Sequence, residues 1–500
     1  MSILVNRVAK KMIASFPKLL VAALALCGAA AILSAQEPDS PPPQTPSPDA
    51  TPTKTPKPAG RGVPSLDPRG AQDQSPDKDW QPDTMPITGL QAPTVGNQDL
   101  RHSYIVPGFQ YSSTIQNQQL GATSSSSSGG WYANHFLGAN LSLVQQWVRS
   151  QLTINYSGGG FLTSESGQSN GWYQQLAFAQ TFNWRRWQMQ ILDQFSYLPE
   201  SQFGFGGGTG LSLPGISGPL GPSTPPIGGS VSPNQNNFAA VGPQYNNSTV
   251  AQLTYQTSPR SSITVGGSYG LSRYTEAGNV NSNTYVGNLG YNYQLTKEDS
   301  IGVFYRFSAY HFDTSARPIG DQVISLVYER RITRRIALQL EGGPDITTHT
   351  DLLGVQQRSI SASGGANLRY SFHRGDVSAA YSHSVSSGGG LLTGSTMDQV
   401  TFNATKPIGR AWSLQANAGF ARNHTLSDTS SSQTTGFNSI FAGGGISRAI
   451  GRDTNLSFAY QARIQQQSLS NCSGTGCSSS YTQSSIVVNL QWHTRPFVLR

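Results

Sequence analysis

From residue 101 onward, hydrophobic and polar residues alternate along the chain with a period of two. The alternation is clear in residues 262–271, 285–295, 360–370, 412–420 and 456–464. Successive side chains of a β-strand point to opposite faces, so each segment is predicted to be a strand with one apolar and one polar face. Segments of about ten residues with this pattern are typical of strands that cross hydrocarbon, with lipid on one side and water on the other.

The connections between these segments show a second regularity. Short, mostly charged turns are predicted at 146–149, 183–186, 258–261, 296–300, 333–335, 373–376, 406–410 and 451–454. Longer polar segments are predicted at 118–131, 157–171, 199–246, 272–283, 312–320, 344–357, 386–397, 424–436 and 467–481. The two kinds alternate, which predicts about 18 strands with both chain ends on the short-turn side. The expected fold class is all-β, a closed antiparallel transmembrane β-barrel with short periplasmic turns and long outer loops, since an open sheet edge in lipid would leave backbone groups unpaired.

This architecture resembles porin-like outer-membrane β-barrel proteins of bacteria. The resemblance covers residues 103–500 and rests on the succession of strands, turns and loops, without any site motif. It implies insertion by the barrel-assembly machinery, which often reads a terminal aromatic residue; here Phe497 is expected to serve, three residues before the end. It also implies that the third long loop, residues 199–245, folds into the lumen as a constriction, although a Gly-rich surface loop is an equal alternative.

Two segments precede the predicted barrel (101–500). Residues 1–35 have a basic start, an apolar stretch and a small residue at the expected cleavage site, which predicts a cleavable signal peptide; an uncleaved inner-membrane anchor is the alternative. Residues 36–100 are rich in Pro and poor in apolar residues, which predicts a disordered, extended periplasmic spacer. It is either an inert linker or a tether to peptidoglycan.

Composition agrees with a barrel in a membrane. Charged residues make up 12% of the chain, about half of what soluble domains carry, whereas aromatic residues make up 10%. No apolar run after the N-terminus reaches the roughly 20 residues of a spanning helix. The net charge of +8 comes mainly from arginines near the short turns, which suits anchoring at lipid headgroups. We therefore expect the outer-membrane bilayer as a partner and no nucleic acid.

The phase of the alternation predicts which side chains face the lumen. The predicted charged residues are Arg306, Arg369, Arg463, Glu329 and Glu341, with the acids opposing the arginines. The predicted polar residues are Gln151, Asn155, Asn367, Gln415, Asn417 and Gln461. So few fixed charges suit uncharged hydrophilic solutes; the alternative is that these side chains merely solvate a water-filled or plugged interior. The same phase would place Asp193 on lipid, so a bulge, a shift of phase or a position above the lipid is expected there.

Signals for catalysis are sparse, and we expect neither an enzyme nor a cofactor. Gly266–Gly270 reads G-x-S-x-G but lies within a predicted strand, without the following helix that a nucleophile elbow needs. Asp345, His349 and Asp351 share a predicted outer loop and are interpreted as solvated residues, so no metal site is expected. Cys472 and Cys477 enclose a Gly-containing loop and are predicted to form a disulfide.

The predicted function is an outer-membrane channel for passive diffusion of small hydrophilic solutes, neutral or weakly charged. Two alternatives stay open. One is a barrel that anchors, through residues 36–100, or adheres through its polar loops. The other is a barrel that exports a polysaccharide. The sequence leaves the oligomeric state open.

Overall fold

The computed structural model describes residues 86–87, 90–91, 103–120, 130–164, 170–198, 243–275, 279–313, 318–333, 335–350, 355–372, 375–388, 390, 392–409, 411–426, 434–451, 453–469 and 478–499. The predicted signal peptide, the predicted Cys472–Cys477 disulfide and residues 199–242 lie outside these described residues. Two short strands, β1 (Pro86–Ile87) and β2 (Leu90–Gln91), pair antiparallel within the range predicted to be a spacer.

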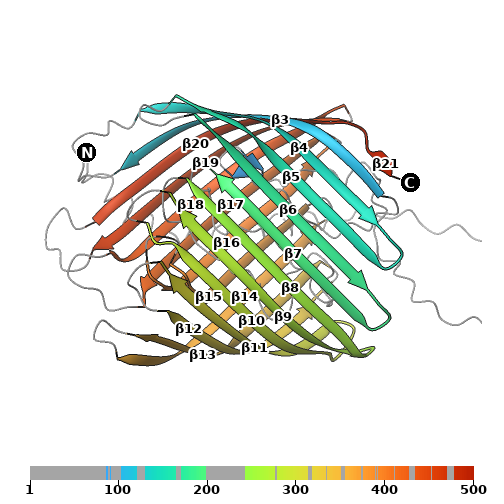
Figure 1. Cartoon of the computed structure of the whole chain (residues 1–500), viewed down its shortest axis with the longest axis vertical. Coiled ribbons are helices and arrows are strands. Elements are labelled where there is room, and N and C mark those ends of the chain that lie inside the picture. The colour runs from blue at the N-terminus through green and yellow to red at the C-terminus, as the bar shows by residue number, and fades with distance from the viewer. Residues whose placement is uncertain are drawn as a thin grey trace, which may run out of the picture. The chain divides into compact units, whose positions relative to one another are not determined.

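Eighteen long strands, β3 to β20, make up the described barrel (Figure 1). Their bounds are β3 Ser103–Leu120, β4 Trp131–Gln146, β5 Ser150–Thr163, β6 Gly171–Asn183, β7 Trp187–Leu198, β8 Gln244–Ser258, β9 Ser261–Tyr274, β10 Ser282–Gln294, β11 Asp299–Phe312, β12 Ile319–Arg331, β13 Ile336–Thr350, β14 Gln356–Phe372, β15 Gly375–Ser386, β16 Ser395–Ile408, β17 Trp412–Thr425, β18 Thr434–Ile450, β19 Thr454–Leu469 and β20 Ser478–His493. Each strand pairs antiparallel with the next in sequence, and β20 pairs with β3 to close the barrel. No helix occurs among the described residues.

The predicted alternation of connections is confirmed. One end of the barrel carries the short turns, such as residues 147–149 between β4 and β5, and is called the short-turn end. The other end carries the longer connections and is called the long-loop end. Two predicted loop bounds are wrong, because β5 continues to Thr163 and β13 to Thr350. Cross-strand pairing in both places extends beyond the point where the apolar alternation fades.

The two faces of the barrel differ as the alternation predicts. On β11, Val303 and Tyr305 are 51% and 40% exposed, whereas Phe304 between them is 3% exposed. The exposed face, here called the outer face, carries the apolar residues of most strands, including Ile263 and Val265 of β9. The inner face carries mainly Ser, Thr, Asn and Gln, and many of these side chains are nearly inaccessible. A closed sheet that is apolar outside and polar inside is the reverse of a soluble barrel.

Aromatic rows border the apolar part of the outer face on β6 to β8. At the long-loop end, the ring of Tyr197 lies 4.8 Å from that of Trp172 and 4.4 Å from that of Tyr245, centroid to centroid. At the short-turn end, Trp187 and Tyr255 are in contact, with their ring centroids 4.3 Å apart. Such rows are typical of the two interfaces of a lipid bilayer.

Asp193 lies on the outer face of β7, between these two aromatic rows. Its register with Phe178 on one side and Thr249 on the other is regular. The expectation of a bulge or a shift of phase at this position is therefore wrong. The carboxylate is tolerated because neighbouring side chains on the same face donate hydrogen bonds to it.

The C-terminus adds one short strand to the closure of the barrel. β21 (Phe497–Leu499) pairs with the start of β3, with Phe497 opposite Ile105, while β20 pairs with the rest of β3. Phe497 is exposed on the barrel surface. Among the described residues, none belongs to a helix long and apolar enough to cross a bilayer.

Candidate functional site: the inner face of the barrel

The inner face carries every residue that the sequence predicted for the lumen. Arg306 belongs to β11, Glu329 to β12, Glu341 to β13, Arg369 to β14 and Arg463 to β19. Arg306, Glu329, Glu341 and Arg463 are in phase with buried neighbours of their strands, and Arg369 is out of phase with the exposed Leu368 and Ile360 of β14. Four of these charges thus lie on the neighbouring strands β11 to β14, and Arg463 lies apart from them on β19.

The best-defined charge pair of the inner face joins Arg306 to a residue that the sequence analysis missed. The guanidinium Nη2 of Arg306 lies 3.6 Å from Oδ2 of Asp321 on β12, whose side chain has no exposed surface. Asp345 of β13 is equally buried and lies on the adjacent strand, where the hydroxyl of Thr347 donates to it at 3.2 Å. The inner wall therefore holds two buried carboxylates beside one guanidinium at the long-loop end of β11 to β13.

The predicted opposition of Glu329 and Glu341 to the arginines is only partly matched. Glu329 is buried, and the hydroxyl of Ser300 donates to it at 3.3 Å. Asp321 lies within ion-pair distance of Arg306, and Asp376 lies 4.0 Å from Arg369. Asp321 was overlooked because it stands at the edge of a predicted loop. The period of two, followed back from Val323, would have found it.

Arg463 is the largest fully buried side chain of the described inner wall, with 1% of its surface exposed. Phe441 of β18 and Gln483 of β20 are its direct cross-strand neighbours. A guanidinium in this position adds a fixed positive charge on the side of the barrel where β3 meets β20.

The predicted neutral residues also lie on the inner face and are distributed over four strands. Gln151 and Asn155 belong to β5, Asn367 to β14, Gln415 and Asn417 to β17, and Gln461 to β19. Asn155 accepts a hydrogen bond of 2.5 Å from Ser142. A neutral, hydrogen-bonding wall of this kind can solvate polar groups of many shapes but does not form one specific pocket.

An aromatic cluster interrupts the polar inner wall. Phe136, Phe161 and Tyr173 on β4, β5 and β6 are 0–2% exposed and pack together. The ring of Phe136 lies 5.0 Å from that of Phe161 and 5.8 Å from that of Tyr173. The interior is therefore less uniformly polar than the alternation predicted.

The connection between β15 and β16, of which residues 387, 388, 390 and 392–394 are described, lies against the inner face at the long-loop end. The backbone N–H of Val280 donates to the carbonyl of Gly390 at 2.7 Å, and the hydroxyl of Tyr310 donates to the carbonyl of Val385 at 3.1 Å. Phe312 and Ile319 join Tyr310 and Val385 in a buried cluster. Because β9 to β12 are three or more strands away from β15, this connection reaches across the inside of the barrel.

Gly390 explains how the connection approaches the wall so closely. Its φ is +84°, a backbone conformation that residues with a Cβ rarely adopt. A Cβ at this position would also lie 2.5 Å from the ring of Tyr274 on β9. The third long loop, which the resemblance to porins predicts as a constriction, lies outside the described residues; residue 390 and its described neighbours are the ones that contact the inner wall.

The residues considered for metal or catalytic chemistry lie on strands β9 and β13 where they are described. Asp345 and His349 belong to strand β13, not to the loop that the sequence predicted, and Asp351 lies outside the described residues. No group of three or more metal-binding side chains comes together in the described part of the chain. Gly266–Gly270 lies within strand β9, as predicted.

Comparisons with known proteins give structural neighbours only. No family model matches the sequence, and no curated protein matches it. The chain is similar in structure to OpdQ of Pseudomonas aeruginosa, with 10% identity over 79% of this chain and 98% of that chain and a TM-score of 0.40. It is also similar to a BenF-like porin from Pseudomonas fluorescens Pf-5 and to Pseudomonas aeruginosa OpdK with vanillate; each is 10% identical with a TM-score of 0.41, and they cover 79% and 78% of this chain and 99% of their own chains. The strand pairing described above, and not this likeness, establishes the barrel.

Proposed function

We propose that this chain is a channel of the bacterial outer membrane, through which small hydrophilic solutes, neutral or weakly charged, diffuse passively. The observation that carries the proposal is the closed barrel with an apolar outer face and a polar inner face. Such a barrel satisfies every backbone group within lipid and leaves a polar interior between two aqueous compartments. Residues 1–35 and 36–100 are proposed to act as an export signal and a periplasmic spacer.

The solute class follows from the charges of the inner face. Arg306 and Arg369 each have an acid beside them, which weakens the field that either would project into the lumen, and Arg463 is buried within the wall. The remaining wall is dominated by neutral hydrogen-bonding side chains. We therefore expect weak ion selectivity and no binding site for one particular solute.

The 387–394 connection narrows the barrel at the long-loop end, which is proposed to face the outside of the cell. The hydrogen bond from Val280 to Gly390 holds it across part of the entrance, and Tyr310 holds Val385 at the end of the preceding strand β15. A channel of this design would admit solutes by size before any selection by charge.

Reconstitution into a planar bilayer tests the proposal. The refolded full chain is expected to give stepwise conductance with a reversal potential close to zero in a salt gradient. Proteoliposomes should swell in neutral sugars and in weakly charged solutes of equal size at similar rates. Heat-denatured protein added at the same concentration is the control. An inserted but electrically silent barrel would contradict the channel and favour an anchoring role.

A further inference from the structure

A row of polar side chains crosses five neighbouring strands on the outer face, near the long-loop end. The row consists of His383, Asp398, Arg422, Asn438 and Gln466, on β15 to β19. Each of these residues is directly opposite the next one in the strand register. Each also lies three or four residues from the long-loop end of its strand. We call this set the polar row.

Directly beneath the polar row lies a row of aromatic and aliphatic side chains. It consists of Tyr381, Val400, Phe420, Ile440 and Ile464, again in direct register across the same five strands. The outer face thus changes from mainly hydrocarbon side chains to polar ones over two residues of each strand. A change this abrupt over five strands marks the edge of the apolar band.

The length of β17 supports this position for the edge. Trp412 stands at the short-turn end of the outer face of β17, ten residues before Arg422. Ten residues span about 33 Å along a strand, and a tilt of about 40° reduces this to about 25 Å of height. This equals the usual height of the apolar band of a bacterial barrel, so Arg422 lies where headgroups meet acyl chains.

Asp398, the acid of the polar row, already has hydrogen-bonding partners on the barrel. Nδ1 of His383 lies 2.7 Å from Oδ1 of Asp398, and the hydroxyl of Tyr381 donates to the same oxygen at 3.1 Å. Arg422, by contrast, is exposed and makes no ion pair or hydrogen bond within the described part of the chain. His424 lies two residues further on the same face and is also exposed, so two cationic or N–H-donating side chains point away from the barrel together.

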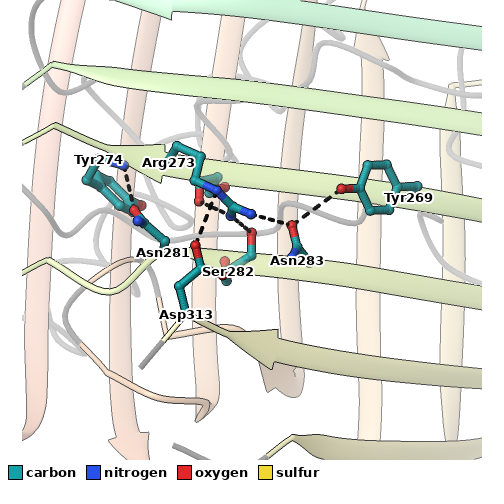
Figure 2. A network of polar contacts seen from close by, with 8 residues as sticks. Tyr269, Arg273, Tyr274, Asn281, Ser282, Asn283 and Asp313 are labelled. Carbon is teal, nitrogen blue, oxygen red and sulfur yellow. Dashed lines mark hydrogen bonds and ion pairs between the residues drawn. The ribbon is translucent and has the colours of Figure 1, made fainter. Parts of the chain in front are cut away.

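Arg273 shows what a satisfied arginine looks like at the same end of the barrel (Figure 2). Its Nε lies 3.4 Å from Asp313, and its Nη1 donates to the carbonyls of Ser272 and Ser282 at 3.1 and 3.0 Å. Its Nη2 donates to Asn283 at 2.9 Å. The N–H donors of the Arg273 guanidinium thus find their acceptors within the chain. Those of the Arg422 guanidinium are available to an acceptor from outside the chain.

We propose that Arg422 and His424 form a docking surface for the phosphate group of a lipid in the outer leaflet of the membrane. The planar guanidinium matches two phosphate oxygens, and an imidazole N–H supplies a further donor. A lipid held there would lay its acyl chains along Phe420 and Ile440 of the apolar row beneath. This surface goes beyond the proposed channel and rests on the proposed placement of the barrel in the outer membrane with its long-loop end outward.

The test compares two forms of one lipid and two matched arginines. The full chain, refolded in detergent micelles, is titrated with lipid A that carries its phosphate groups and with the same lipid after dephosphorylation. The variants are Arg422→Gln, His424→Gln and, as the control, Arg448→Gln. Arg448 lies on the same outer face of neighbouring β18 but near the short-turn end, with its guanidinium 5.0 Å from the ring centre of Trp412. Circular dichroism and heat-modifiable migration verify that each variant is folded.

The unmodified chain is expected to bind the phosphorylated lipid at least about tenfold more tightly than the dephosphorylated one. Arg422→Gln should remove most of this preference for the phosphorylated lipid. His424→Gln should remove part of it, and Arg448→Gln should leave it unchanged. Equal affinity for the two lipids, or a preference that persists in Arg422→Gln, would overturn the docking surface. The conductance of Arg422→Gln should equal that of the unmodified chain, so a failure of this proposal is distinct from a failure of the channel.

Discussion

The carboxylate of Asp193 accepts a hydrogen bond of 2.5 Å from the hydroxyl of Thr249, on the outer face of the barrel. The amide of Asn247 donates to the same carboxylate oxygen at 3.2 Å. Both donors come from β8, the strand next to the one that carries the acid. Between two aromatic rows, these donors take the place that water would have at a soluble surface.

Replacing Thr249 by Val should lower the free energy of unfolding by about 2 kcal/mol, because the carboxylate loses its shortest hydrogen bond in an apolar setting. Urea unfolding in lipid vesicles, followed by tryptophan fluorescence, measures the change. The same substitution made in an Asp193→Leu background should cost much less, since no acceptor is then left there. An equal cost in both backgrounds would mean that the hydrogen bond does not stabilise the barrel.

Replacing Arg306 by Met should lower the free energy of unfolding by about 3–5 kcal/mol, because the fully buried carboxylate of Asp321 is left without its cation. Adding Asp321→Asn should restore most of the loss. Arg369→Met is the matched control: the side chain of its partner Asp376 is 42% exposed, so a change below about 1 kcal/mol is expected. Similar losses for the two arginine variants would contradict this account.

Replacing Gly390 by Ala should move residues 387–394 away from the wall and raise the single-channel conductance. The added Cβ would collide with the ring of Tyr274 and would also strain the backbone at a φ of +84°. Gly409→Ala is a suitable control, because Gly409 has a φ of +68° but no neighbour within 4 Å of its added Cβ. If both variants conduct like the unmodified chain, residues 387–394 do not limit the flow.

Deleting residues 204–240 should raise the conductance if the third long loop also narrows the lumen. The resemblance to porins predicts this role, and the loop carries a single charge, Glu200, which stays in place in this variant. The deletion should change the reversal potential little, since no charged residue is removed. Unchanged conductance would assign the narrowing to residues 387–394 alone.

The sequence was sufficient to predict the fold because two independent signals agree. Alternation assigns the faces of each strand, as in Ile263 and Val265, and the succession of short turns and long loops sets the number of strands. Both signals are local. The closed order of β3 to β20 then follows from pairing each strand with the next.

The candidate site was harder to predict because it depends on contacts between distant strands. The alternation predicted that Arg306 faces inward, but its pairing with Asp321 depends on the register of β11 with β12. The contact of Gly390 with Tyr274 joins segments more than a hundred residues apart, and no local pattern encodes it. Asp193 was misjudged because the cost of a carboxylate in lipid was considered without the donors on the next strand.

The seam between the first and last long strands has a consequence for how the chain reaches its native state. Gln483 of β20 donates to Gln116 of β3 across 367 residues of sequence. Neither of these two strands can complete its ladder until the other has been synthesised, so the C-terminal strand arrives as the final partner of the N-terminal one. A chain interrupted shortly before Ser478 would carry seventeen of the long strands, and β3 and β19 would be unpaired edge strands. Such a chain is expected to be degraded or to aggregate rather than to form a smaller pore.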